Sequence, residues 1–156
     1  MTPLPKADRL AALVSNVTET MLGLSFVPAA TVAAHPGLTW RTAIMLVDGA
    51  RPVSVGLSSD EPGCTKLAAA MFGCKPDGVD VGMINDALCE LVNMTAGLLK
   101  REMLLDQALS VPSIIDDKQA LGEIARQHPA LVLIAREVGI ALWACDGLLK
   151  WNAKAA

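Results

Sequence analysis

The sequence has few aromatic residues and few charges: it contains two phenylalanines, three tryptophans and no tyrosine, and 19% of its residues are charged. Proteins that bind single strands stack bases on aromatic rings, and duplex binders place a basic surface against the phosphates. Here 16 acidic residues outnumber 13 basic ones, which gives a formal net charge of −3. We therefore expect no nucleic-acid partner.

The chain also has no closely paired cysteines and only two histidines. Structural zinc sites normally draw their ligands from close pairs such as Cys-x-x-Cys, so we expect no metal site. The pattern favours buried, reduced cysteines over disulfides, as is usual in the cytoplasm. The residues concerned are Cys64, Cys74, Cys89, Cys145, His35 and His128.

Long uninterrupted apolar runs are absent as well. Prolines and a glycine interrupt the least charged stretch, residues 20–40, and three charged residues lie within the apolar run of residues 130–149. Neither stretch is typical of a membrane-spanning helix. The first ten residues show no apolar core of signal-peptide length. We expect a cytoplasmic protein with no membrane span.

With 156 residues and no low-complexity linker, the chain is expected to form a single domain over residues 1–156, with 150–156 as a frayed tail. Hydrophobic residues make up 53% of it, and its mean hydropathy of +0.43 is high for a soluble monomer. This value indicates either an unusually aliphatic core or an apolar surface covered by a second copy. A homodimer is therefore one expectation.

Hydrophobic periodicity and turn signals predict strand pairs alternating with helices, hence an α+β domain with a mostly antiparallel sheet. Asp48-Gly49 is a strong hairpin signal, and a second hairpin is expected around Gly139. The predicted helices cover residues 6–22, a segment starting at 58–61 and ending at 72, 81–104 and 116–127. The predicted strands cover residues 24–27, 40–47, 52–57, 107–115, 131–136 and 140–145.

One face of the long predicted helix carries an unusual polar stripe. Asp86, Glu90, Asn93 and Gly97 follow one another at helical spacing, and Glu90 and Asn93 are neighbours on the helix surface. Glycine costs about 1 kcal/mol relative to alanine inside a helix, and asparagine is a mediocre helix former. The stripe is therefore either an ordinary solvated face or a surface that another backbone approaches closely. The opposite, core-facing residues are predicted to be Ile84, Ala87, Leu88, Leu91, Met94, Thr95, Leu98 and Leu99.

This stripe resembles the signature helix of the CheX/CheC/FliY family of chemotaxis phosphatases. The signature is Asp or Ser, three residues, Glu, two residues, Asn, then a glycine and a downstream proline. Asp86, Glu90, Asn93, Gly97 and Pro112 match it. The preceding segment, residues 53–73, is similar to the family's strand, serine-rich turn and helix. A single motif resembles the CheX branch most, although Cys89 and Leu98-Leu99 depart from the usual pattern.

The resemblance implies a CheC-like fold. It also implies that the substrate is the aspartyl phosphate of a CheY-type receiver domain. It implies that Asn93 positions the attacking water and that Glu90 pairs with the receiver's active-site lysine. No cofactor is expected on this chain, because the receiver would bring its own Mg²⁺. Lys100 and Arg101 either give local charge complementarity to the partner or, as we favour, serve only the helix dipole, and Asp86 either contacts the partner or favours the first turn of the helix. The candidate partner-binding residues are Asp86, Gly97, Lys100 and Arg101.

Three hypotheses about function remain. The retention of both Glu90 and Asn93 favours a phosphatase that ends the receiver's signal. The altered positions Cys89, Leu98 and Leu99 keep open a module that binds a receiver or flagellar-switch component without hydrolysis. A dimeric structural protein whose polar stripe is only solvated is the third.

Overall fold

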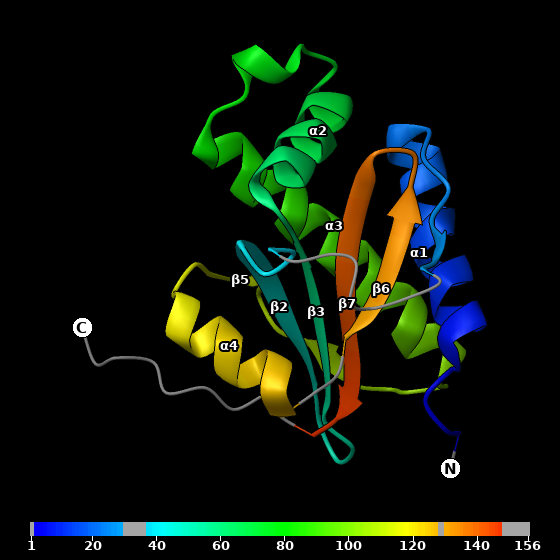
Figure 1. Cartoon of the computed structure of the whole chain (residues 1–156). Helices are drawn as coiled ribbons and strands as arrows, with labels where there is room; N and C mark the ends of the chain where they lie inside the picture. Colours follow the sequence, from blue (N-terminus) through cyan, green and yellow to red (C-terminus); the bar gives the residue numbers. More distant parts are fainter. Residues whose placement is uncertain (1, 30–36, 128–129, 148–156) are drawn as a thin grey trace.

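The computed structural model describes residues 2–29, 37–127 and 130–147, and Figure 1 shows their arrangement. Seven strands in this part of the chain form one sheet in the order β1-β6-β7-β3-β2-β4, and β5 also pairs with β2. All the pairings are antiparallel, which confirms the predicted α+β class. The strands are β1 (Val27–Pro28), β2 (Arg41–Asp48), β3 (Val53–Ser59), β4 (Ala108–Leu109), β5 (Ser113–Ile115), β6 (Leu131–Ala135) and β7 (Val138–Asp146).

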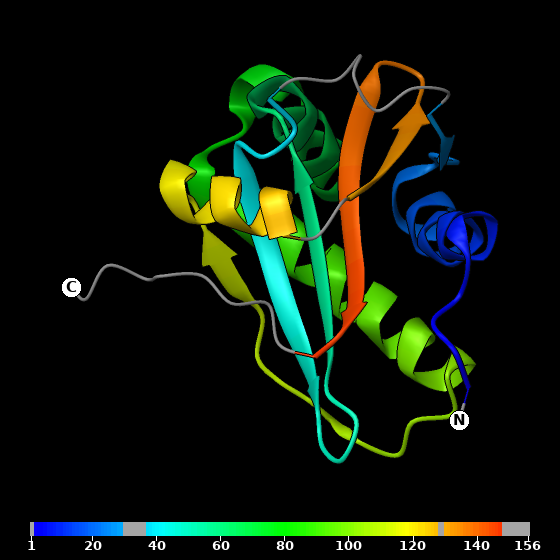
Figure 2. The ribbon, with the colours of Figure 1, turned by 60° about the horizontal axis from the view of Figure 1, so that its bottom comes forward.

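Helices cover both faces of the sheet, because side chains alternate between its two faces along each strand. On β2, Ala43 and Met45 pack in the larger core cluster with three helices, whereas Ile44 packs in a second cluster with the fourth helix. Figure 2 shows that fourth helix in front of β2 and β3 and the long helix behind them. The helices are α1 (Ala7–Leu22), α2 (Glu61–Phe72), α3 (Val81–Glu102) and α4 (Lys118–Gln127).

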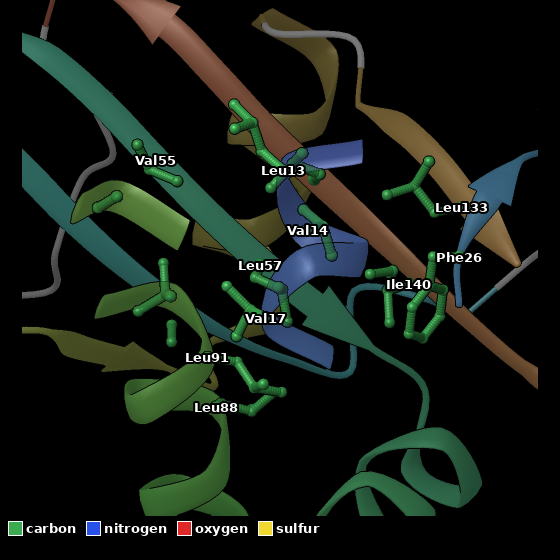
Figure 3. Close-up of a cluster of buried hydrophobic side chains, with 14 of the residues drawn as sticks. Leu13, Val14, Val17, Phe26, Val55, Leu57, Leu88, Leu91, Leu133 and Ile140 are labelled. Carbon is green, nitrogen blue, oxygen red and sulfur yellow. The ribbon is translucent and has the colours of Figure 1, made fainter. Parts of the chain in front are cut away.

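The larger core is almost entirely aliphatic. Figure 3 shows side chains of α1, α3 and the sheet in contact there, among them Val14, Leu57 and Leu88. Leu88 and Val14 are fully buried, and Leu57 is almost fully buried. Burying such side chains is the main favourable contribution to folding. The high hydropathy of the chain is thus explained at least in part by this core.

The first predicted hairpin and the helix after it are confirmed. β2 and β3 pair through the turn that contains Asp48-Gly49. The Asp60 carboxylate caps α2 by accepting from the Gly63 backbone N–H at 2.7 Å, and Gly73 ends the helix in the left-handed conformation at φ 63°. Local signals determine both elements, so the sequence predicts them well.

The second hairpin turns elsewhere than predicted. Ala135 pairs with Val138, so the turn consists of Arg136 and Glu137, whereas Gly139 lies inside β7 opposite Ile134. The expectation placed a glycine at the turn because glycine tolerates positive φ. Here Arg136 adopts that conformation instead, at φ 54°.

Several smaller expectations are also corrected or remain outside the described residues. β1 covers only Val27–Pro28 rather than residues 24–27, and α4 begins after Asp117, whose carboxylate accepts from the Gln119 N–H. All four cysteines are free, but only Cys64 is buried as expected: Cys89 and Cys145 are half-buried, and Cys74 is exposed. The two histidines and the expected tail lie outside the described residues. No helix in the described part of the chain is both long enough and apolar enough to cross a membrane.

The edge of the sheet beside β2 contains a bulge. Leu109 of β4 lies opposite Val47, and Ser113 of β5 lies opposite Ile44. Three steps along β2 therefore correspond to four steps from Leu109 to Ser113. One extra residue in the edge strand is the definition of a β-bulge, and it accommodates Pro112, which has no N–H for the ladder. The strand predicted over residues 107–115 is thus divided into β4 and β5, with Pro112 in the interruption.

Candidate functional site

The candidate site lies on α3, whose ends are defined by local interactions. The Asp80 carboxylate caps its first turn by accepting from the Met83 backbone N–H at 2.8 Å. Lys100 and Arg101 occupy its last turn, where cations interact favourably with the helix dipole. The helix is long enough to carry the whole polar stripe without interruption.

The buried face of α3 is rotated slightly from the predicted one. Met94 and Leu98 are only half-buried, while Val92 and Ala96 are fully buried. α1 and α2 pack on this helix in addition to the sheet. The residues of α3 that are buried therefore depend on contacts with two helices as well as with the strands. The buried residues are Ile84, Ala87, Leu88, Leu91, Val92, Thr95, Ala96 and Leu99.

Three residues of the polar stripe line a groove of about 480 Å³. Asp86, Glu90 and Asn93 are all exposed and form one wall of the groove, with Cys89 between them. The bulge between β4 and β5 forms the other wall, through Ser110, Val111 and Pro112. The structure thus brings three of the predicted site residues together and adds the predicted downstream proline.

The remaining three predicted residues do not line this groove. Gly97 lies one turn beyond Asn93 and is half-buried, and a Cβ added to it would meet no atom within 4 Å. Nothing in the described chain therefore requires a glycine there. Lys100 and Arg101 lie further along, half-buried and exposed respectively.

The charge of the groove comes from Asp86 and Glu90, and no lysine or arginine is among the described residues that line it. Partial burial raises the pKa of the Cys89 thiol, and the nearby Asp86 carboxylate raises it further. Cys89 is therefore a poor nucleophile at neutral pH, since the thiolate is the reactive form. Asn93 offers an amide, which can both donate and accept a hydrogen bond to one water without changing its charge.

Arg41 connects the start of β2 to the N-terminal half of α3. Its guanidinium donates to Asn85 Oδ1 at 3.0 Å, and its side chain is only 12% exposed. The same guanidinium lies 5.0 Å from the centre of the Trp40 ring and 3.9 Å from Asp116. This contact ties α3 to the sheet immediately beside Asp86.

Three other candidate nucleophiles are buried outside the groove. Ser58 and Ser59 are buried in β3, and Ser59 Oγ donates to the Gly139 carbonyl at 2.5 Å. Cys64 is buried at the start of α2, and desolvation raises the pKa of its thiol to about 12. None of the three side chains is placed for nucleophilic chemistry.

Sequence reasoning missed Ser110 and Val111 as parts of the site. Ser110 instead fastens the bulge: its Oγ accepts from the Leu46 N–H at 2.9 Å, and its own N–H donates to the Leu46 carbonyl at 2.8 Å. Only Pro112, which interrupts a strand pattern, gave a signal for an irregular edge at this position.

One comparison with known proteins identifies a family. The family model described as chemotaxis phosphatase CheX matches residues 41–135. No curated protein sequence is significantly similar to the chain. Three similar crystal structures share its fold at low sequence identity.

The first is a putative chemotaxis protein from Desulfovibrio vulgaris Hildenborough (19% identity, 90% of this chain and 96% of that one, TM-score 0.66). The second is the chemotaxis protein CheX from Vibrio vulnificus (18%, 94% and 100%, TM-score 0.68). The third is a CheX-CheY-BeF3-Mg²⁺ complex from Borrelia burgdorferi (13%, 94% and 100%, TM-score 0.67).

Proposed function

This chain belongs to the CheX family of chemotaxis phosphatases, and from that premise we propose that it hydrolyses the aspartyl phosphate of a CheY-type receiver domain in the cytoplasm. The observation that carries the proposal is the joint exposure of Glu90 and Asn93 on one wall of an open groove. The two residues are three apart on a continuous helix, so their side chains are held side by side.

The proposed chemistry is mainly a matter of positioning. An acyl phosphate is already activated, so hydrolysis requires a water held in line with the leaving oxygen. The Asn93 amide orients that water, and the Glu90 carboxylate pairs with the receiver's active-site lysine. The Mg²⁺ belongs to the receiver. A hundredfold acceleration corresponds to about 2.7 kcal/mol, which a well-placed amide and a docked partner can supply.

The acidic character of the groove supports this assignment of roles. Asp86 and Glu90 provide two carboxylates on the wall that a lysine side chain would approach.

A CheX protein of the same fold is known in complex with CheY. A groove between a helix and a sheet edge, open to solvent, also suits a protein substrate better than a small molecule in a closed cavity.

The test is the decay of a phosphorylated CheY-type receiver, followed alone, with the wild-type protein and with Glu90→Lys. We expect the wild type to accelerate decay and Glu90→Lys to lose both acceleration and binding, because a lysine would repel the receiver's lysine. Asp106→Lys makes a similar change of charge at an exposed position outside the groove and should behave as wild type. Unaltered decay despite binding of the wild type would identify a non-catalytic receiver-binding module instead.

The open space at Gly97 leads to a second prediction. Gly97→Ala should raise the free energy of unfolding by about 0.5–1 kcal/mol, because alanine is the better helix former and its methyl meets nothing. The same variant should bind the receiver more weakly, since we propose that the partner's backbone approaches this glycine. Urea denaturation and a binding titration measure the two effects.

Gly122→Ala is the matched control, because Gly122 also lies within a helix and a Cβ there also meets no atom within 4 Å. It should stabilise the protein in the same way and leave receiver binding unchanged. Equal binding by the two variants would remove Gly97 from the proposed interface.

We also propose that the protein is a homodimer, on the basis of its hydropathy and the resemblance to the CheX branch. Light scattering at micromolar concentration gives the molar mass directly. A monomer alone under these conditions would contradict the proposal.

A further inference from the structure

The wall of the groove opposite Asn93 ends in an unusually exposed valine. Val111 is 84% exposed, more than any other large hydrophobic residue among those described, and it lines the same groove as Glu90 and Asn93. A single exposed apolar residue is common on protein surfaces and by itself indicates nothing. The exposure of Val111 is informative only together with the backbone conformation that places it in the groove.

The bulge holds Val111 out of the sheet. A regular edge strand would place residue 111 in the ladder with β2, but the extra residue between Leu109 and Ser113 interrupts the pairing. Bulges of this kind redirect a side chain and are common beside active sites. Here the redirected residue borders the groove rather than the core.

The bulge is also fastened on both sides. Ser110 makes two hydrogen bonds with Leu46. Its backbone N–H donates to the Leu46 carbonyl, and its side-chain Oγ accepts from the Leu46 N–H, where a regular ladder would have a backbone carbonyl. β4 and β5 then pair with β2 immediately before and after it. Val111 is thus presented from a held backbone and not from a loosely attached loop.

Charge provides a reason for an apolar contact at this place. The chain has a net charge of −3, and the groove carries two carboxylates. Overall electrostatics therefore opposes association with a receiver that is itself acidic. Local pairing at Glu90 offsets part of that repulsion, and burial of apolar surface is insensitive to charge.

We infer that Val111 is a docking residue that packs against an apolar side chain of the receiver beside its phosphorylated aspartate. This inference rests on the proposed function. The site then has two walls: α3 supplies the acid and the amide, and the bulge supplies an apolar contact that strengthens receiver binding. Val111 does not touch the reacting atoms, so its contribution is to binding.

The test compares Val111→Thr with Val27→Thr in the receiver dephosphorylation assay. Threonine keeps the shape of valine but replaces a methyl group by a hydroxyl, which is costly to bury without a partner. We expect Val111→Thr to raise KM about tenfold, or 1.4 kcal/mol, with kcat unchanged, because a docking contact is made equally in the ground and transition states. Val111→Ile should retain or improve the wild-type KM.

Val27 is the matched control, since it is a 60% exposed valine on β1, at the opposite edge of the sheet from the bulge. If Val111→Thr and Val27→Thr both match a wild type that is active, the inference is wrong and the proposed function stands. If the wild type neither binds nor dephosphorylates any receiver, both are wrong. A change in the molar mass of the protein alone on Val111→Thr would overturn the inference by assigning the bulge to a contact between copies of this chain.

Discussion

Replacing Asn93 by alanine is expected to reduce kcat for receiver dephosphorylation about a hundredfold, or 2.7 kcal/mol, while the affinity for the receiver stays close to that of the wild type. Asn93 is exposed on the groove wall, so its removal leaves no buried group unsatisfied and no cavity. The amide is proposed to act only by orienting water, and alanine can neither donate nor accept that hydrogen bond. Single-turnover decay of the phosphorylated receiver at saturating phosphatase measures the loss.

Two further variants show whether the amide itself matters. Asn93→Asp keeps the size of the side chain but loses its N–H donors and adds a third carboxylate to the groove, so its activity should fall as well. Asn16→Ala removes an exposed asparagine from α1 and should have wild-type activity. Full activity of Asn93→Ala would mean that another group positions the water.

Truncating Leu88 to alanine is expected to destabilise the protein by about 3 kcal/mol, within the range of 2.7–5 that such changes cause in well-packed cores. Leu88 lies on the buried face of α3 and is fully buried among other aliphatic side chains (Figure 3). The cost combines the lost burial with the cavity that remains. Urea denaturation followed by circular dichroism gives the free energy of unfolding of each variant.

Leu104→Ala makes the same truncation at a residue that is 82% exposed. Its free energy of unfolding should lie within about 0.5 kcal/mol of the wild-type value. If the two variants lost equal stability, Leu88 would not be part of a close-packed core.

The helices and their ends could be predicted because their determinants are local. Periodicity places α1 and α3, while Asp60 and Gly73 show where α2 begins and ends. The stripe of Asp86, Glu90 and Asn93 is readable for the same reason: all three residues belong to one helix, so their mutual arrangement follows from their spacing alone.

Features that depend on partners distant in sequence could not be predicted. The position of Val111 follows from the register of two short strands against β2, more than sixty residues earlier in the chain. Arg136 takes a turn conformation that local preference assigns to glycine, because the pairing of β6 with β7 requires the turn there. The rotation of α3 toward Val92 and Ala96 likewise depends on neighbouring helices.

The shape of the second wall of the groove depends on the number of residues in the edge strand. Deleting one residue between Leu109 and Ser113 would let β4 and β5 join in a single register with β2, and the second wall would become a flat strand edge. No substitution of one side chain for another achieves that change. Insertions and deletions at this edge are therefore a route by which the shape of such a site can diverge while the helix that carries Glu90 and Asn93 stays intact.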